Sequence, residues 1–147
     1  MLVHGSCAAL LDEAVLILGT PGSGKSDLVL RLLQRGWTLV ADDQVSCGPE
    51  GQVTAPDALR GLLEVRGLGV FEGLAVADGA RLRLAVALAP RGAVPRLPRP
   101  AVWTSPAGRA VPLVTLDPFE PSACAKVALA LEGACGRLGQ RAGAFAA

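Results

Sequence analysis

The sequence predicts an α/β fold in which a strand-rich, mixed β-sheet carries a phosphate-binding loop, with one helix after the loop and a second at the C-terminus. The first observation is an apolar run, a glycine-rich loop and a helical pattern in direct succession, from residue 14 to 36. The second is that about eight strand-like segments accompany only one further convincing helix, at 122–138. A doubly wound sheet would need more helices. We therefore expect a single domain spanning residues 1–147.

Residues 19–26 read GTPGSGKS and fit the Walker A pattern G-x-x-x-x-G-K-[ST] of phosphate-binding loops. The apolar run 14–18 before the loop is typical of a buried strand, and leucines at helical spacing follow it as far as Gly36. Glycines let backbone N–H groups point at phosphate, while Lys25 would contact the β- and γ-phosphates and Ser26 would bind Mg²⁺. The predicted nucleotide site comprises Gly19, Thr20, Pro21, Gly22, Ser23, Gly24, Lys25 and Ser26.

Acidic residues follow the next apolar strand, 38–41, as the pair Asp42 and Asp43. Phosphotransfer enzymes place a metal-binding or proton-accepting carboxylate at such a strand end. Adjacent residues on an extended chain point to opposite sides, so only one of the two faces the phosphate; the alternative is a solvated turn. Glu64 and Arg66 lie two apart beside a glycine-rich loop, which suits metal and phosphate contact or, alternatively, a surface ion pair.

Two further residues are candidates through their neighbours in sequence. His4 precedes the loop closely enough for a hairpin to fold it back beside the phosphate site, although it would equally suit a sheet edge. Arg96 lies in a proline- and arginine-rich segment that suits a loop clamping the nucleotide or the acceptor, or a solvated linker. The rest of the chain is expected to form two short strands or one bent strand at 2–11, a hairpin at 44–56, a helical turn at 58–63, a strand at 81–89, a hairpin at 102–116 and a tail that frays after residue 139.

Composition excludes several other classes of function. The net charge is +1 and no basic run with interleaved aromatic residues occurs, so neither nucleic acid nor a membrane is expected as a partner. The four cysteines are far apart and His4 is the one histidine, which disfavours a zinc site and suggests free thiols in a reducing compartment. Without a signal-like or membrane-length apolar segment, we expect a cytoplasmic protein.

These motifs, taken in order, resemble the HPr kinase/phosphorylase family. The matching segments are His-Gly at 4–5, the loop at 19–26, Arg-Gly-x-x-Leu-Val-Ala-Asp-Asp at 35–43 and Leu-Glu-Val-Arg-Gly-Leu-Gly-Val at 63–70. The resemblance covers the family's catalytic domain, as in the short forms typical of α-proteobacteria. It implies a cytoplasmic protein-serine kinase of the phosphotransferase system that uses ATP and Mg²⁺ to phosphorylate a serine of the phosphocarrier protein HPr. The resemblance also implies a homo-oligomer, namely a hexamer. Many members of the family also reverse the phosphorylation of HPr.

The resemblance assigns roles to seven residues: His4 and Arg96 belong to the active site, Lys25 binds phosphate, Ser26 and Glu64 bind Mg²⁺, Asp43 accepts the proton of the acceptor serine, and Arg66 steadies phosphate. The segment associated with dephosphorylation carries arginines in the family and none at 116–123 here, which leaves that activity open. Two other functions stay open, namely a kinase of the same fold with another protein or small molecule as acceptor, and a nucleotide-binding regulator without transfer.

Overall fold

The computed structural model describes residues 1–146. Within this range the chain forms eleven strands, two α-helices and two short 3₁₀ helices. In chain order these are β1 (Leu2–His4), β2 (Ser6–Leu10), β3 (Glu13–Leu18), α1 (Lys25–Leu33), β4 (Thr38–Ala41), β5 (Gln44–Cys47), β6 (Val53–Thr54), η1 (Asp57–Leu59), β7 (Leu63–Val65), β8 (Gly69–Phe71), β9 (Arg81–Leu88), η2 (Arg91–Ala93), β10 (Val102–Thr104), β11 (Ala110–Leu116) and α2 (Ala123–Ala134).

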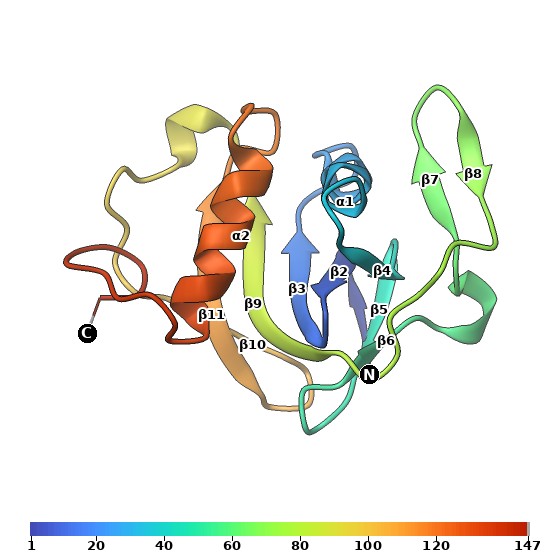
Figure 1. Cartoon of the computed structure of the whole chain (residues 1–147), viewed down its shortest axis with the longest axis horizontal. Coiled ribbons are helices and arrows are strands. Elements are labelled where there is room, and N and C mark those ends of the chain that lie inside the picture. Colours follow the sequence, from blue (N-terminus) through green and yellow to red (C-terminus); the bar gives the residue numbers. More distant parts are fainter. Residues whose placement is uncertain (147) are drawn as a thin grey trace.

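The largest sheet has six strands in the order β10-β11-β9-β3-β2-β4 (Figure 1). β3, β9 and β11 pair in parallel, whereas β2 is antiparallel to both β3 and β4, and β10 is antiparallel to β11. The predicted mixed α/β sheet is thereby confirmed. Since β4 and β3 are each antiparallel to β2, both run in the same direction. Their C-terminal ends therefore meet at one edge of the sheet, where the phosphate-binding loop begins.

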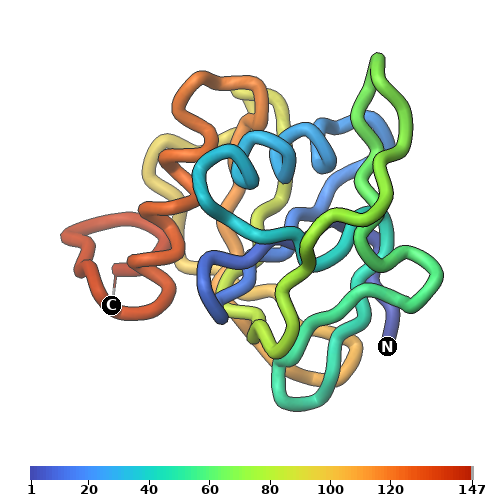
Figure 2. The backbone as a smooth tube through the Cα atoms, turned by 45° about the vertical axis from the view of Figure 1, so that its right-hand side comes forward, coloured from blue at the N-terminus to red at the C-terminus, as the bar shows by residue number. Residues whose placement is uncertain are grey.

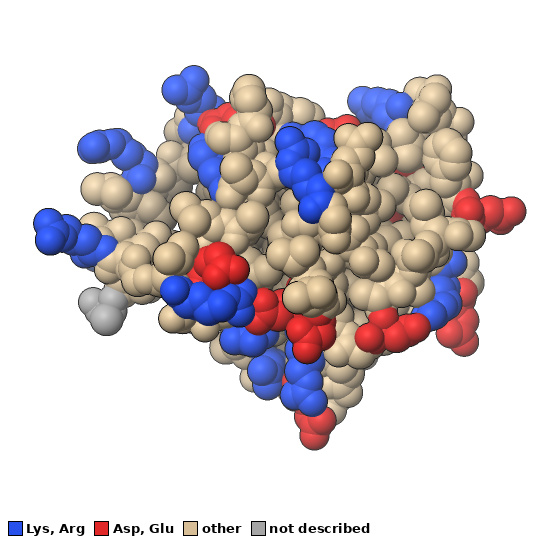
Figure 3. All heavy atoms as spheres, in the orientation of Figure 1, with Lys and Arg blue, Asp and Glu red and all other residues tan. Residues whose placement is uncertain are grey.

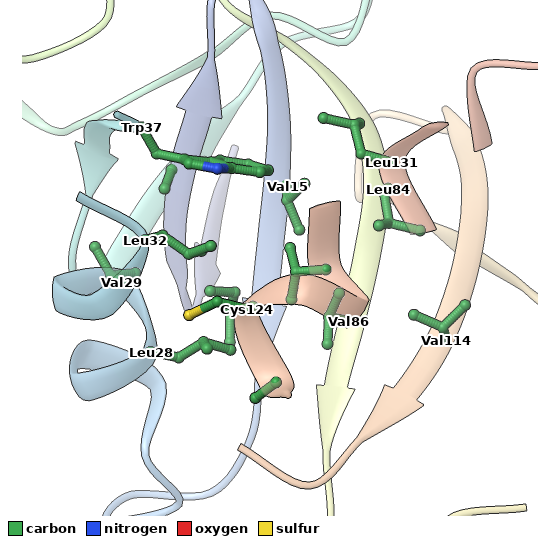
Figure 4. Close-up of a cluster of buried hydrophobic side chains, with 14 of the residues drawn as sticks. Val15, Leu28, Val29, Leu32, Trp37, Leu84, Val86, Val114, Cys124 and Leu131 are labelled. Carbon is green, nitrogen blue, oxygen red and sulfur yellow. The ribbon is translucent and has the colours of Figure 1, made fainter. Parts of the chain in front are cut away.

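Both helices cover the same face of this sheet (Figure 1). Alternation along β3 explains the layering, because Val15 and Ile17 face the helices while Leu16 faces the opposite side. Figure 4 shows side chains from α1, α2 and the sheet meeting in the helix-side core, with the Trp37 ring at its edge. The opposite face packs against residues of the small sheet β1-β5-β6, such as Val45. Burial on both faces gives the loop a rigid support.

The hairpin of β7 and β8 stands away from the main sheet beside α1, as both ribbon and tube show (Figures 1 and 2). It forms a separate two-stranded sheet, and contacts between β7 and α1 fix its base. The hairpin carries the segment in which Glu64 and Arg66 occur. The predicted glycine-rich loop is thus the tip of a hairpin that reaches toward the phosphate-binding loop.

The C-terminal region differs from the expectation in two respects. Helix α2 ends at Ala134, four residues before the predicted end, and the chain then turns away. As far as residue 146, where the described part of the chain ends, the tail does not fray: Ala144 is buried, and the Phe145 ring lies so close over Gly133 that an added Cβ there would be 2.6 Å from it. The apolar side chain of Phe145 therefore anchors the tail on α2. In residues 1–146, no helix combines the length and apolar character needed to span a membrane.

Candidate active site

A cavity of about 430 Å³ opens at the sheet edge where β3 and β4 end. It brings together the phosphate-binding loop, the start of α1, the end of β4, the hairpin strand β7 and the segment that precedes α2. Its lining residues are Ser6, Pro21, Gly22, Gly24, Lys25, Ser26, Asp27, Leu30, Asp42, Asp43, Glu64, Val65, Arg66 and Phe119. Eight of the predicted site residues thus share one cavity, namely Pro21, Gly22, Gly24, Lys25, Ser26, Asp43, Glu64 and Arg66. The cavity lining does not include the other predicted loop residues, Gly19, Thr20 and Ser23.

The phosphate-binding loop ends at Gly24, which has a φ of 105° and directly precedes the first residue of α1. That left-handed conformation favours glycine and turns the chain into the helix. The Lys25 ammonium donates hydrogen bonds to the carbonyl oxygens of Gly19 (2.9 Å) and Thr20 (3.0 Å), so it lies against the loop backbone. Ser23 Oγ is buried without a hydrogen-bond partner among the described residues. The free N–H groups of the helix start, with Lys25 beside them, suit an anion.

A segment before α2 covers one side of the loop. A Cβ added at Gly24 would lie 3.1 Å from Phe119 Cζ and 3.2 Å from Pro118 Cγ, so both rings pack directly on the loop. Arg31 of α1 donates a hydrogen bond to the Pro118 carbonyl oxygen and ties the segment to the helix. Sequence reasoning missed Phe119, because Asp-Pro-Phe-Glu-Pro indicates only a break in the chain. No local pattern in the sequence would have placed its ring against the loop.

Asp42 is the hydrogen-bonding centre of the site. Its Oδ1 accepts hydrogen bonds from Ser26 Oγ (2.8 Å) and Ser6 Oγ (2.7 Å), and its Oδ2 accepts one from the Glu64 N–H (3.2 Å). The residue is only 7% exposed, and no ion pair within residues 1–146 includes it. A buried carboxylate needs such partners, because burial without them is costly. The chain thus holds Ser26 and the base of the hairpin through one carboxylate, which the sequence indicated only as a member of the Asp42 and Asp43 pair and without this role.

Asp43 is exposed and lines the cavity beside the buried Asp42. The two carboxylates therefore face different surroundings, as expected for neighbours on an extended chain. Asp43 has a φ of 72°, which is uncommon for a residue other than glycine, is tolerated by Asp better than by most residues, and recurs at active sites. Its carbonyl oxygen accepts a hydrogen bond from the Gly5 N–H (3.1 Å). His4 pairs with Gln44 between β1 and β5 and does not line the cavity.

Glu64 and Arg66 lie at and just beyond β7, and both line the cavity with exposed side chains. No ion pair joins them in the described part of the chain, so the surface-pair alternative has no support. Arg96 lies elsewhere. It lines a second cavity of about 380 Å³ between the 94–98 segment, α2 and the C-terminal tail. Its assignment to the active site, like that of His4, stays a prediction.

The donor set of the first cavity fits a magnesium ion. Ser26 offers a hydroxyl, Asp42 and Glu64 offer carboxylates, and all three line the same space. Mg²⁺ prefers oxygen ligands, and it is usually held by one or two carboxylates together with substrate phosphates and water. Within residues 1–146, no group of three His, Cys, Asp or Glu side chains could hold a metal by itself. The arrangement therefore suits a metal that arrives with a nucleotide.

Charge elsewhere on the molecule is dispersed. Figure 3 shows lysine and arginine side chains at several separate points of one face, interrupted by acidic and uncharged residues. On this face no continuous basic surface suggests a nucleic-acid partner. The charges of interest are those gathered in the cavity.

The comparison with family models decides the affiliation. The model described as the HPr serine kinase C-terminal domain matches residues 1–91, more than half of the chain. The chain belongs to this family. The matched residues include the loop, the paired aspartates and the β7–β8 hairpin. All the predicted site residues that line the first cavity therefore fall within the match. Arg96 and Phe119 lie outside it.

Individual relatives agree with the family match. The chain is 45% identical over 102 residues to the HPr kinase/phosphorylase of Stenotrophomonas maltophilia K279a, a match that covers 60% of this chain and 31% of that protein. It is 42% identical over 120 residues to the HPr kinase/phosphorylase of Xanthomonas campestris pv. campestris B100, covering 72% and 34%. The chain therefore spans about a third of the length of these curated relatives. The structure of the HPr(Ser) kinase/phosphatase from Coxiella burnetii superimposes with a TM-score of 0.73 at 24% identity, covering 93% of this chain and 96% of that one.

Proposed function

We propose that the protein is an ATP-dependent serine kinase that phosphorylates a serine of the phosphocarrier protein HPr. The observation that carries the proposal is a single cavity in which a phosphate-binding loop meets Asp43, Glu64 and Arg66. The family affiliation and the names of the relatives support HPr as the acceptor. The family resemblance also favours a homo-oligomer, a hexamer, as the working form.

The loop amides and Lys25 would bind the β- and γ-phosphates, and Ser26 and Glu64 would hold Mg²⁺. Bound Mg²⁺ would neutralise charge on those phosphates. Asp43 would orient the acceptor serine and take its hydroxyl proton while the serine oxygen forms a bond to the γ-phosphorus and the bond from that phosphorus to the β,γ-bridging oxygen breaks. ADP leaves with the electron pair of that bond. Arg66 would steady the transferred group, so that positioning and electrostatics supply most of the rate.

The exposed position of Asp43 supports its role, because a base for a protein substrate has to reach a side chain that enters from solvent. Its left-handed backbone conformation also supports it, since such conformations in residues other than glycine recur at active sites. Asp42, by contrast, is buried and already occupied by three donors. It suits the holding of Ser26 rather than proton transfer.

The test is to incubate the protein with Mg-ATP and purified HPr and to map phosphoserine on HPr by mass spectrometry. We expect one phosphorylated serine, and none when Mg²⁺ is chelated. Transfer to another protein or small molecule in place of HPr would identify a kinase of the same fold with a different acceptor. Nucleotide-dependent thermal stabilisation without transfer to any acceptor would identify a regulator. Incubation of phosphorylated HPr with the protein then tests the reverse reaction.

A further inference from the structure

Ser6 is a buried hydroxyl inside the active site that none of the assigned roles uses. The residue is 0% exposed by surface area, and it nevertheless contributes to the lining of the cavity. It begins β2, the strand between β3 and β4 in the sheet. Its hydroxyl donates to Asp42 Oδ1 over 2.7 Å, and this is the shortest of the three hydrogen bonds that Asp42 accepts. Packing alone does not explain a buried hydroxyl that is hydrogen-bonded to a carboxylate of the site.

We infer that Ser6 is a positioning residue for the magnesium site and acts through Asp42. Ser6 and Ser26 donate to the same carboxylate oxygen, Oδ1. While the Ser26 proton is directed at Asp42, the lone pairs of Ser26 Oγ remain free for a cation in the cavity. Ser6 fixes the orientation of the carboxylate that receives this proton. The inference rests on the proposed role of Ser26 as a magnesium ligand.

Asp42 also contacts the second proposed Mg²⁺ ligand, Glu64, through its other carboxylate oxygen. Asp42 Oδ2 accepts the backbone N–H of Glu64, so a rotation of the carboxylate would disturb both Ser26 and the base of β7. Ser6 comes from a strand buried on both faces, whereas the Glu64 hairpin stands away from the sheet. Ser6 therefore links the hairpin side of the site, through Asp42, to the buried main sheet. Hydrogen-bonding partners behind metal ligands typically change metal affinity when they are removed.

The test measures how much Mg²⁺ the protein needs in order to bind ADP. ADP is held constant, Mg²⁺ is titrated, and nucleotide-dependent thermal stabilisation is recorded for the wild type and for Ser6→Ala. We expect the half-saturating Mg²⁺ concentration to rise about tenfold in Ser6→Ala, a loss typical of outer partners of metal ligands. Binding of ADP without Mg²⁺ should stay unchanged, because the phosphate-binding loop is not altered.

Ser105→Ala is the matched control. Ser105 is also a buried serine, and its Oγ accepts the Arg109 N–H over 3.1 Å. It follows β10, the edge strand at the opposite end of the main sheet from β4. Its loss should affect stability alone and leave the Mg²⁺ requirement at the wild-type value. If Ser6→Ala does not fold, Ser6→Cys, which is similar in size but a weaker donor, provides the same measurement.

A double-mutant comparison separates action through Asp42 from a general packing effect. Adding Ser6→Ala to Asp42→Asn should raise the Mg²⁺ requirement no further than Asp42→Asn alone. Equal Mg²⁺ half-points for the wild type and a folded Ser6 variant would overturn the inference, as would fully additive effects in the double mutant. Since ADP and Mg²⁺ suffice, the outcome does not depend on HPr. Failure to phosphorylate HPr would contradict the proposed function and leave this result intact.

Discussion

Gly5 and Asp43 are joined by a backbone hydrogen bond of 3.1 Å, in which the Gly5 N–H donates to the Asp43 carbonyl oxygen. This bond connects the turn between β1 and β2 to the residue after β4 that has the left-handed φ of 72°. The adjacent Asp42 takes no part in this bond, and its carboxylate accepts hydrogen bonds from the Ser6 and Ser26 hydroxyls. Backbone and side-chain contacts thus fix the two aspartates in different orientations, one exposed and one buried.

Replacement of Asp43 by Asn should abolish phosphate transfer without weakening nucleotide binding. Asn tolerates the left-handed conformation, so the backbone should be retained. Loss of a general base lowers the rate by about 10²- to 10⁴-fold. Transfer to HPr and the affinity for Mg-ADP are measured on the same preparation. Asp27→Asn, which removes another carboxylate that lines the cavity, serves as the control. Wild-type transfer rates in Asp43→Asn would remove Asp43 from the mechanism.

Replacement of Gly5 by Ala should destabilise the protein and slow transfer together. A Cβ at Gly5 would lie 2.8 Å from the Ile17 carbonyl oxygen, a backbone atom that has to move. We expect the free energy of unfolding to fall by about 1–3 kcal/mol, as for overpacking elsewhere. Urea denaturation measures the change. The control is Gly92→Ala, since nothing lies within 4 Å of a Cβ there. Equal stability of the two variants would show that the turn adapts without strain.

Replacement of Lys25 by Met should weaken Mg-ATP binding while leaving the fold intact. The ammonium bonds only to loop carbonyl oxygens in the described structure, so its removal should leave the core unchanged. A hydrogen bond to a charged group contributes about 1.5–3 kcal/mol, which corresponds to a loss of affinity of about 10- to 100-fold. Calorimetric titration checks this, with Lys126→Met as control because Lys126 pairs with Glu120 on the surface. Equal losses in both variants would argue against a phosphate contact.

The ion cluster around Glu13 should make stability depend on pH in acid. Hydrogen bonds from Arg137 are the main reason that the pKa of Glu13 is lowered to about 2. A lowered pKa in the folded state stabilises the protein above the usual pKa of the carboxyl group, and this contribution is lost as pH falls from there toward about 2. Arg137→Ala should therefore reduce the unfolding free energy near neutral pH and change it less near about pH 2.

Glu13→Gln tests the same cluster without a titrating group. Its unfolding free energy should vary less with pH between about 5 and 2 than that of the wild type. An identical acid dependence in the wild type and Glu13→Gln would show that other carboxyl groups govern acid stability.

The elements that position the site could be predicted from the sequence because local patterns specify them. The apolar runs leading to Gly19 and Asp42 produced strands at the expected places, and the glycine pattern of the loop marked the start of α1 at Lys25. The alternation of apolar and polar residues did not show which strands lie side by side. The interpretation of 2–11 left one or two strands open, whereas the chain forms β1 and β2 in different sheets.

Features that depend on distant contacts escaped prediction. Ser6 beside Gly5 indicated only a bend, and nothing in the sequence placed its hydroxyl 2.7 Å from Asp42, 36 residues away. The prediction that the tail frays after residue 139 was wrong for the same reason, because Phe145 packs over Gly133 of α2. The roles of the site residues, including those of His4 and Arg96, stay predictions that measurements on the bound enzyme have to test.

The most direct test of the account is a crystal structure with Mg²⁺ and a non-hydrolysable ATP analogue, in which the distances from Mg²⁺ to Ser26 Oγ and to the Glu64 carboxylate are measured. The account predicts both at about 2.0–2.1 Å, the usual Mg²⁺–oxygen distance, with the Asp43 carboxylate facing the γ-phosphate from the acceptor side. A nucleotide bound elsewhere, or a metal that neither Ser26 nor Glu64 contacts, would contradict it.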